Sequence, residues 1–166
     1  MQQKRQQHYD KRNSFKDEIL GAATAAGSIA VPVKLAVEFE SSMADVRKVI
    51  DFDTPQQFKE MEQDILRLTR TIPMAGSELA KIAASGGQLG IARKDISSFT
   101  ETIAKMSVAF DMSAEQAGES MAKLANVYQI PITQIGKLGD AINHLSNSSP
   151  AKASEIVNAL DRKSVV

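Results

Sequence analysis

The sequence predicts an all-α protein, a multi-helix domain of about seven or eight amphipathic helices joined by Gly and Pro turns. Apolar residues recur at steps of three and four, which places their side chains on one face of an α-helix. Aromatic residues make up only 5% of the chain and Trp is absent, so the core volume must come from Ala, Ile, Leu, Val and Met, which suits closely packed helices. No stretch shows the sustained alternation of a β-strand.

Two regions are expected, residues 1–33 and residues 34–166. The first opens with a polar, Gln- and charge-rich lead-in, compatible with an exposed or extended helix. An uncharged run of small residues then begins at Ile19 and ends at Val33, shorter than the roughly 20 residues that a membrane-spanning helix needs. This run predicts a helix packed closely on its neighbours. Membrane contact is the alternative, because small residues four apart also serve helix contacts in lipid.

The second region is expected to begin with a helix from about Lys34 to Ile50, whose stripe starts at Leu35. The tetrad that begins at Thr54 is the clearest helix start in the chain, because it combines an N-cap Thr, Pro55 at the first helical position and Gln57 three residues after the cap. This helix is expected to continue through Leu68 until Pro73.

A short helix is expected from about Ser77 to Ser85. The cluster Gly86-Gly87-Gln88-Leu89-Gly90 follows it and predicts a left-handed stop and a turn. The next helix is expected to end near Phe110.

One set of five apolar positions occurs twice in the chain, with the same internal steps. Ile91, Ile96, Phe99, Ile103 and Met106 correspond to Ile130, Ile135, Leu138, Ile142 and Leu145. The resulting 39-residue spacing lies in the range of helical pairs that bury their stripes on neighbouring units. A repeat of this kind would suit scaffolding and binding. With only two copies, however, chance similarity between amphipathic helices is the preferred explanation, and a true duplication is the alternative.

Proline and capping residues divide the last part of the chain. Ser113 with Gln116 has the pattern of a capping box and predicts a new helix. Pro131 breaks the chain before the following helix. Ser149 and Pro150 repeat the cap-then-proline signal and predict the start of a last helix, which runs to about Leu160.

The core is expected on the apolar stripes of these helices. Its expected members are Phe39, Met43, Val46, Ile50, Phe58, Ile65, Leu68, Leu79, Ile82, Ile91, Ile96, Phe99, Ile103, Met106, Met121, Leu124, Ile130, Ile135, Leu138, Ile142, Leu145, Ile156 and Leu160. The expected turn and cap residues are Thr54, Pro55, Gly86, Gly87, Gly90, Ser113, Pro131, Ser149 and Pro150.

Composition argues against several function classes. Lys plus Arg equals Asp plus Glu at 20 each, so the basic excess typical of nucleic-acid binders is missing and no specific nucleic-acid recognition is expected. The chain has no Cys, which excludes disulfides and thiolate zinc sites.

Several residues resemble sites of chemistry without meeting its requirements. The Gly-rich cluster at residues 86–90 lacks a preceding strand and both phosphate-loop fingerprints, so a helix–helix turn is the better interpretation. His8 and His144 have no acid or nucleophile at diagnostic spacing, and both are expected to be solvated. We therefore expect no catalytic and no cofactor-binding residues.

Asp51, Asp53 and Glu60 could suggest a metal cluster. The Asp pair precedes a helix start, where carboxylates are favoured by the helix dipole. The further oxygen ligands and the Gly of a calcium loop are missing. No metal site is expected.

Three stretches resemble the conserved region of phage tail tape measure proteins of contractile-tailed temperate phages and prophages. They are AVEFESSMADVRKVIDFDTPQQF (residues 36–58), ELAKIAASGGQLGIARKDISSFTETIAKMSVAFDMSAEQAGESMAKL (78–124) and IGKLGDAINHLSNSSPAKASEIVNAL (135–160). The Gly-Gly-Gln-x-Gly-Ile turn in the second stretch is the most specific of these features. Full members of the family are much longer, so the resemblance predicts that this chain is an N-terminal fragment.

The resemblance implies a structural protein in the lumen of the tail tube, without catalytic residues or cofactors. It implies roles in tail assembly, in setting tail length and in genome passage. The implied partners are tail-tube, tail assembly chaperone, baseplate or tip proteins and the chain itself, in the virion tail or in the host cytoplasm during assembly. The run from Ile19 to Val33 adds a contact with the host membrane as an alternative.

A molecular ruler requires a long uninterrupted helix, since a helix rises about 1.5 Å per residue. Pro residues at 32, 55, 73, 131 and 150 and the Gly cluster interrupt this chain. We therefore expect a compact head rather than the ruler itself. The alternative functions are a membrane-active helical segment and an unrelated helical-repeat adaptor that binds a peptide.

Overall fold

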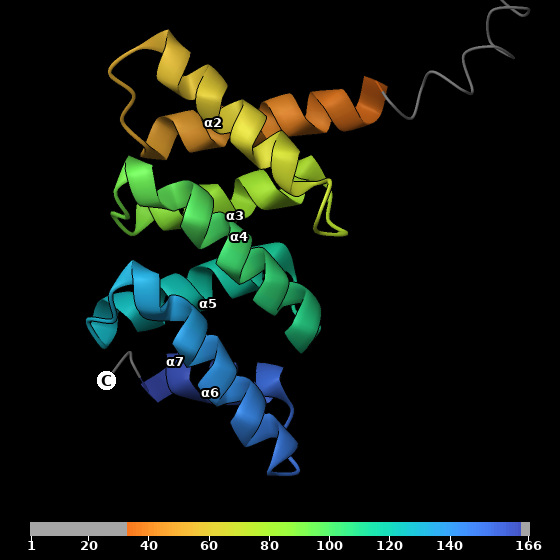
Figure 1. Cartoon of the computed structure of the whole chain (residues 1–166), viewed down its shortest axis with the longest axis vertical. Coiled ribbons are helices and arrows are strands. Elements are labelled where there is room, and N and C mark those ends of the chain that lie inside the picture. Colours follow the sequence, from red (N-terminus) through yellow and green to blue (C-terminus); the bar gives the residue numbers. More distant parts are fainter. Residues whose placement is uncertain (1–32, 164–166) are drawn as a thin grey trace, which may run out of the picture. The chain divides into compact units, whose positions relative to one another are not determined.

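The structure is a computed structural model that describes residues 33–163 (Figure 1). Over these residues it contains seven α-helices, one 3-10 turn and no strand, which confirms the all-α prediction. The first helix covers residues 33–49. The others are α2 (Pro55–Leu68), α3 (Gly76–Gln88), α4 (Arg93–Phe110), α5 (Ala114–Val127), α6 (Ile135–Asn147) and α7 (Ala153–Lys163).

The chain divides into two compact units, residues 1–38 and residues 39–166. Of the first unit the structure describes only residues 33–38, where Leu35 is 51% exposed. Apart from Val33, the region expected at residues 1–33, including His8 and the uncharged run, lies outside the described residues. The fold below is that of the second unit.

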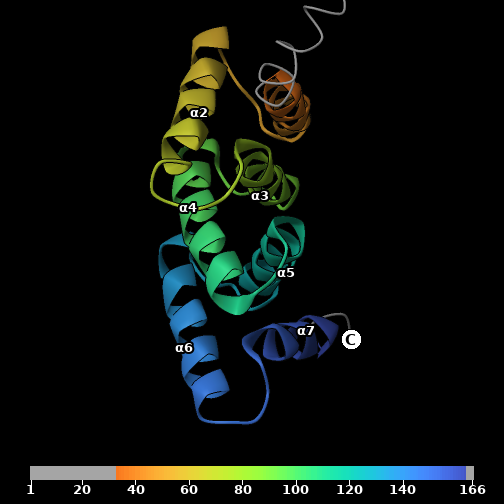
Figure 2. The ribbon, with the colours of Figure 1, turned by 90° about the vertical axis from the view of Figure 1, so that its right-hand side faces the viewer.

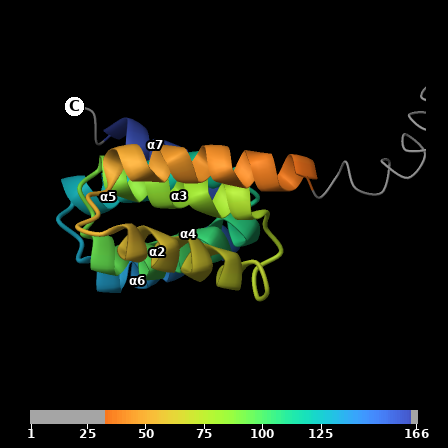
Figure 3. The same cartoon turned by 90° about the horizontal axis from the view of Figure 1, so that it is seen from above.

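Helices of the second unit alternate between two layers (Figures 2 and 3). The first layer contains residues 39–49, α3, α5 and α7, and the second layer contains α2, α4 and α6. Within a layer, consecutive helices pack side by side: α3 on α5 and α5 on α7, α2 on α4 and α4 on α6. Between the layers, α4 packs against both α3 and α5. The unit is therefore a stack of helical pairs.

The 39-residue spacing corresponds to a structural unit of this stack. The two helices of the sequence repeat, α4 and α6, occupy consecutive places in the second layer. The spacing also extends beyond the residues from which it was inferred. Met43, Ile82, Met121 and Leu160 follow one another at this same spacing, and all lie in the first layer. Each unit buries its apolar side on the next, as expected for stacked repeats.

Two helix starts follow the expected capping chemistry, with one difference. Thr54 Oγ1 accepts a hydrogen bond from the Gln57 N–H at 3.3 Å, and Ser113 Oγ accepts one from the Gln116 N–H at 3.2 Å. The Gln116 side chain does not complete a capping box. Its amide donates instead to Asn158 Oδ1 at 2.9 Å and joins α5 to α7.

The Gly-rich turn begins later than the sequence predicts. Gly86 and Gly87 belong to the last turn of α3, which continues to Gln88, and of the three glycines only Gly90 has a left-handed φ, +79°. A Cβ at Gly86 would lie 2.9 Å from the Phe99 ring. The cluster therefore supplies the expected left-handed stop at Gly90, whereas Gly86 and Gly87 still belong to the helix and permit close helix packing.

The start of the last helix also differs from the expectation. Ser149 and Pro150 lie in the connection before α7 and do not cap it, because α7 begins at Ala153. At the observed start, the Lys152 N–H donates to Glu155 Oε2 at 3.1 Å. Pro131 precedes a 3-10 turn (Ile132–Gln134) that leads into α6.

Most residues expected in the core are buried or half-buried. Buried are Met43, Val46, Ile50, Ile65, Leu79, Ile82, Ile96, Phe99, Ile103, Met106, Met121, Leu124, Ile135 and Ile142. Partly buried against them are Phe39, Phe58, Leu68, Ile91, Ile130, Leu138, Ile156 and Leu160. The expectation that Leu145 belongs to the core was wrong, because its side chain is 51% exposed. It lies on α6, the last second-layer helix of the described residues.

Candidate interaction surface

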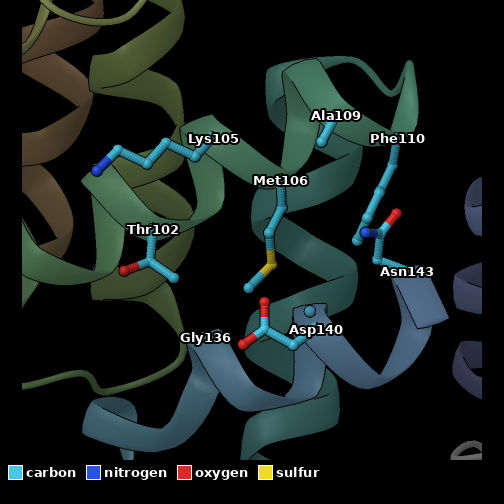
Figure 4. A pocket seen from close by; sticks show the side chains of 9 residues that line it. Thr102, Lys105, Met106, Ala109, Phe110, Gly136, Asp140 and Asn143 are labelled. Atoms are coloured by element: carbon cyan, nitrogen blue, oxygen red, sulfur yellow. The ribbon is translucent and has the colours of Figure 1, made fainter.

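A groove of about 280 Å³ lies between α4 and α6 in the second layer. Figure 4 shows that its walls come from these two helices, which are far apart in sequence. The lining residues are Thr102, Lys105, Met106, Ala109, Phe110, Gly136, Gly139, Asp140 and Asn143. The groove exists because two helices of the same layer pack side by side with small residues between them.

The floor of the groove depends on a glycine. A Cβ at Gly139 would lie 2.3 Å from Met106 Cε and 2.9 Å from its Sδ. Figure 4 shows the Met106 side chain extending from α4 towards α6. Met fills irregular space well because its chain is unbranched and flexible. The contact between Met106 and Gly139 therefore sets how closely α6 approaches α4.

Polar side chains stand on both walls. Lys105 Nζ is held by Glu101 Oε1 at 2.6 Å, one turn earlier on α4. Thr102 lies on the same wall, and Asp140 and Asn143 lie on the α6 wall. An apolar floor with polar walls suits an inserted apolar side chain and hydrogen bonds at its edges. None of the lining residues forms a nucleophile–base pair of the kind that covalent catalysis uses.

A second cleft, of about 270 Å³, crosses the first layer. Residues 42–49, α3 and α5 supply its walls, and its charged members are Asp45, Lys48, Lys81, Glu115 and Glu119. Lys48 Nζ pairs with Asp45 Oδ1 at 2.7 Å. The cleft is more polar than the groove and has the character of a solvated surface.

The residues that resembled chemistry in the sequence are not gathered into a site. Asp53 accepts a hydrogen bond from Gln57 Nε2 at 3.2 Å, as part of the start of α2. His144 is exposed in the last turn of α6. Between residues 33 and 163 no three His, Cys, Asp or Glu side chains are grouped so that they could hold a metal ion. In the same range, the helices fall short of the length and apolarity needed to cross a membrane.

Sequence reasoning did not identify the groove. Its determining residues are mostly small or polar, and such residues do not form the apolar stripe that marks a core position in a sequence. One signal was available, because Gly139, buried on α6, occupies the repeat position that Thr100, also buried, occupies on α4. Extending the repeat to small residues points to the close approach of the two helices.

These features define a class of protein: an all-α stack of helical pairs with clefts between the helices of each layer. The chain belongs to the family described as phage-related minor tail protein, whose sequence profile matches residues 62–165. This membership agrees with the resemblance inferred from the sequence.

A relative from Halomonas phage phiHAP-1 supports the same placement. It is described as a probable tape measure protein. The two sequences are 28% identical over an alignment 169 residues long, and this alignment covers 95% of this chain. The aligned part is 20% of the relative, so the chain spans about a fifth of that protein's length. No solved structure matches the chain.

Proposed function

We propose that this chain is part of a tape-measure-type tail protein that acts in phage tail assembly and in the determination of tail length. The observation that carries the proposal is the similarity to a probable tape measure protein along 95% of the chain. The family is one of structural tail proteins, so we propose no enzymatic turnover and no cofactor.

Within that role, the described section serves as a compact head rather than as the ruler. Its longest helix among residues 55–163, α4, has 18 residues and is about 27 Å long at 1.5 Å per residue. A section folded as stacked pairs advances far less per residue than an extended helix. The length-setting segment therefore lies in other parts of the longer protein.

The partners we propose are tail-tube, tail assembly chaperone, baseplate or tip proteins and other copies of the chain. The groove between α4 and α6 supports a protein-binding role, because it combines an apolar floor with polar walls. The proposed location is the tube lumen of the virion tail, and the host cytoplasm during assembly. A role in genome delivery, with membrane contact through residues 19–33, is the part of the proposal that rests on sequence alone.

The decisive experiment is deletion of the parent gene from an inducible prophage. Lysates should contain heads but lack normal tails in electron micrographs, and a plasmid copy should restore the tails. A copy with His8→Ala and His144→Ala should restore them equally well, since neither histidine is assigned any chemistry. Tails of normal length in the deletion strain would refute the tape-measure proposal.

A further inference from the structure

The repeat positions at the α6–α7 end of the stack are less covered than their counterparts inside it. Met106 is 7% exposed, whereas Leu145, its counterpart in the next repeat, is 51% exposed. Ile82 and Met121 are 0% and 1% exposed, whereas Leu160, the next residue in that series, is only partly buried. The same repeat position thus changes from buried to accessible at the last described unit.

The structure also shows what covers these positions inside the stack. Met106 on α4 is covered by α6, the next helix of the second layer, at Gly139, where an added Cβ would meet Met106 Cε at 2.3 Å. Leu145 occupies the place on α6 that Met106 occupies on α4. Covering Leu145 in the same way requires a further second-layer helix with a small residue opposite it.

We propose that the end face, defined by Leu145 on α6 and Leu160 on α7, is a docking surface for a further amphipathic helix of the second layer. The helix would pack on α6 as α6 packs on α4, and on α7 as α4 packs on α3. The interface is thus a continuation of one already present in the fold. The docking helix carries apolar residues at the positions that Ile135 and Ile142 occupy on α6, and a small residue at the position of Gly139.

The continuation of the same polypeptide supplies this helix. The chain covers only 20% of its relative from phage phiHAP-1, so that protein has much additional sequence. The family profile also extends through α7 to residue 165. A covalently linked helix has a high effective concentration at the end face, which favours it over a separate copy of the chain.

The test extends the full chain with a copy of its own second-layer helix. Residues 128–147 are appended after Val166, which keeps the 39-residue register. The matched control carries Ile135→Asn and Ile142→Asn in the appended copy alone. Hydrogen–deuterium exchange is then measured in α6, α7 and the appended helix. The apolar extension should slow exchange in α6 and α7 by about tenfold or more, and the control should leave it unchanged.

Leu145→Asp provides the second measurement. Because Leu145 is exposed, the variant should fold normally in the unextended chain, as checked by circular dichroism, and should abolish the protection in the extended chain. Equal exchange with the apolar and control extensions would overturn the proposal. So would an oligomer of the unextended chain that Leu145→Asp converts to monomer, since a second copy would then occupy the end face. Neither result bears on the tail role, which the gene deletion tests separately.

Discussion

The glycines of this chain differ in how much space surrounds them. Replacing a glycine by alanine should therefore lower the free energy of unfolding at one position and raise it at another. A Cβ at Gly87 would lie 2.5 Å from Ile50 Cγ1 and 3.1 Å from the Val49 carbonyl oxygen. At Gly136 the nearest atom is Thr102 Cγ2, at 4.0 Å. Both glycines are helical, so only the space around them distinguishes them.

Gly87→Ala should lower the free energy of unfolding by about 1–3 kcal/mol, because the added methyl group forces the helix ending at residue 49 away from α3. Gly136→Ala should raise it by up to about 1 kcal/mol, because Ala favours a helix over Gly and its methyl group meets only an ordinary contact here. Urea unfolding followed by circular dichroism measures both. Equal changes for the two variants would contradict this account.

Two buried hydroxyl groups on α4 form a second contrasting pair. Ser107 is 2% exposed and its Oγ donates to the Met112 carbonyl at 2.8 Å, which helps to end the helix. Thr100 is 0% exposed and its Oγ1 has no hydrogen-bond partner. A buried polar group without a partner loses its hydration without compensation.

Thr100→Val should therefore stabilise the protein by about 1 kcal/mol, because Val has the shape of Thr without the unpaired hydroxyl. Ser107→Ala should destabilise it by about 1 kcal/mol, because it leaves the Met112 carbonyl without its donor. Thermal unfolding of the two variants beside the parent chain measures both shifts. A Thr100→Val variant that melts below the parent would indicate an undetected partner for the hydroxyl.

At the scale of elements, α4 is a helix with packing partners in both layers. It packs on α3 and α5 across the layers and on α2 and α6 within its own. Phe99 and Ile103 on its inner side are 0% exposed, whereas Val108 on its outer side is 50% exposed. Its two sides should therefore respond differently to the same substitution.

Ile103→Asp should cost more than about 3 kcal/mol of stability, because it places an unpaired charge in an apolar core. Val108→Asp, on the same helix, should change stability by less than about 0.5 kcal/mol, because the side chain remains in water. Helical circular dichroism at rising urea concentrations separates the two variants. A mild effect of Ile103→Asp would mean that α4 does not organise the stack.

At the scale of the whole molecule, the helices of the stack differ in how many of their residues are buried. The buried residues number seven in α3, eight in α4 and eight in α5, but three in α6 and two in α7. In stacked repeats each unit is stabilised mainly by its neighbours, so units with fewer buried contacts open more easily.

Native-state hydrogen exchange should accordingly give the highest opening free energies in α3, α4 and α5 and lower values in α6 and α7. The Gln116–Asn158 hydrogen bond is one of the links between α5 and α7, so Asn158→Ala should accelerate exchange in α7 while leaving α3 unchanged. Uniform protection from α3 to α7 would instead show that the stack opens as one cooperative unit.

Much of this fold could be predicted from the sequence because the relevant signals are local. The 3.6-residue periodicity, Pro55 at a first helical position and the capping hydroxyls of Thr54 and Ser113 depend on residues within one or two turns. These signals predict helices and their starts. The 39-residue spacing left a true repeat open as an alternative, and the structure places the two helices concerned, α4 and α6, next to each other in one layer.

Only the tertiary structure decided the remaining features, because each depends on a neighbour far away in sequence. Gly86 and Gly87 read locally as a turn, yet Phe99 and Ile50 lie so close to them that they serve helix packing. Leu145 has the spacing of a core residue, but it is exposed because no described helix packs over it. The groove between α4 and α6 likewise arises where Met106 meets Gly139, on a helix that is not its neighbour along the chain. Periodicity determines which side of a helix is apolar, and the arrangement of helices determines what covers that side.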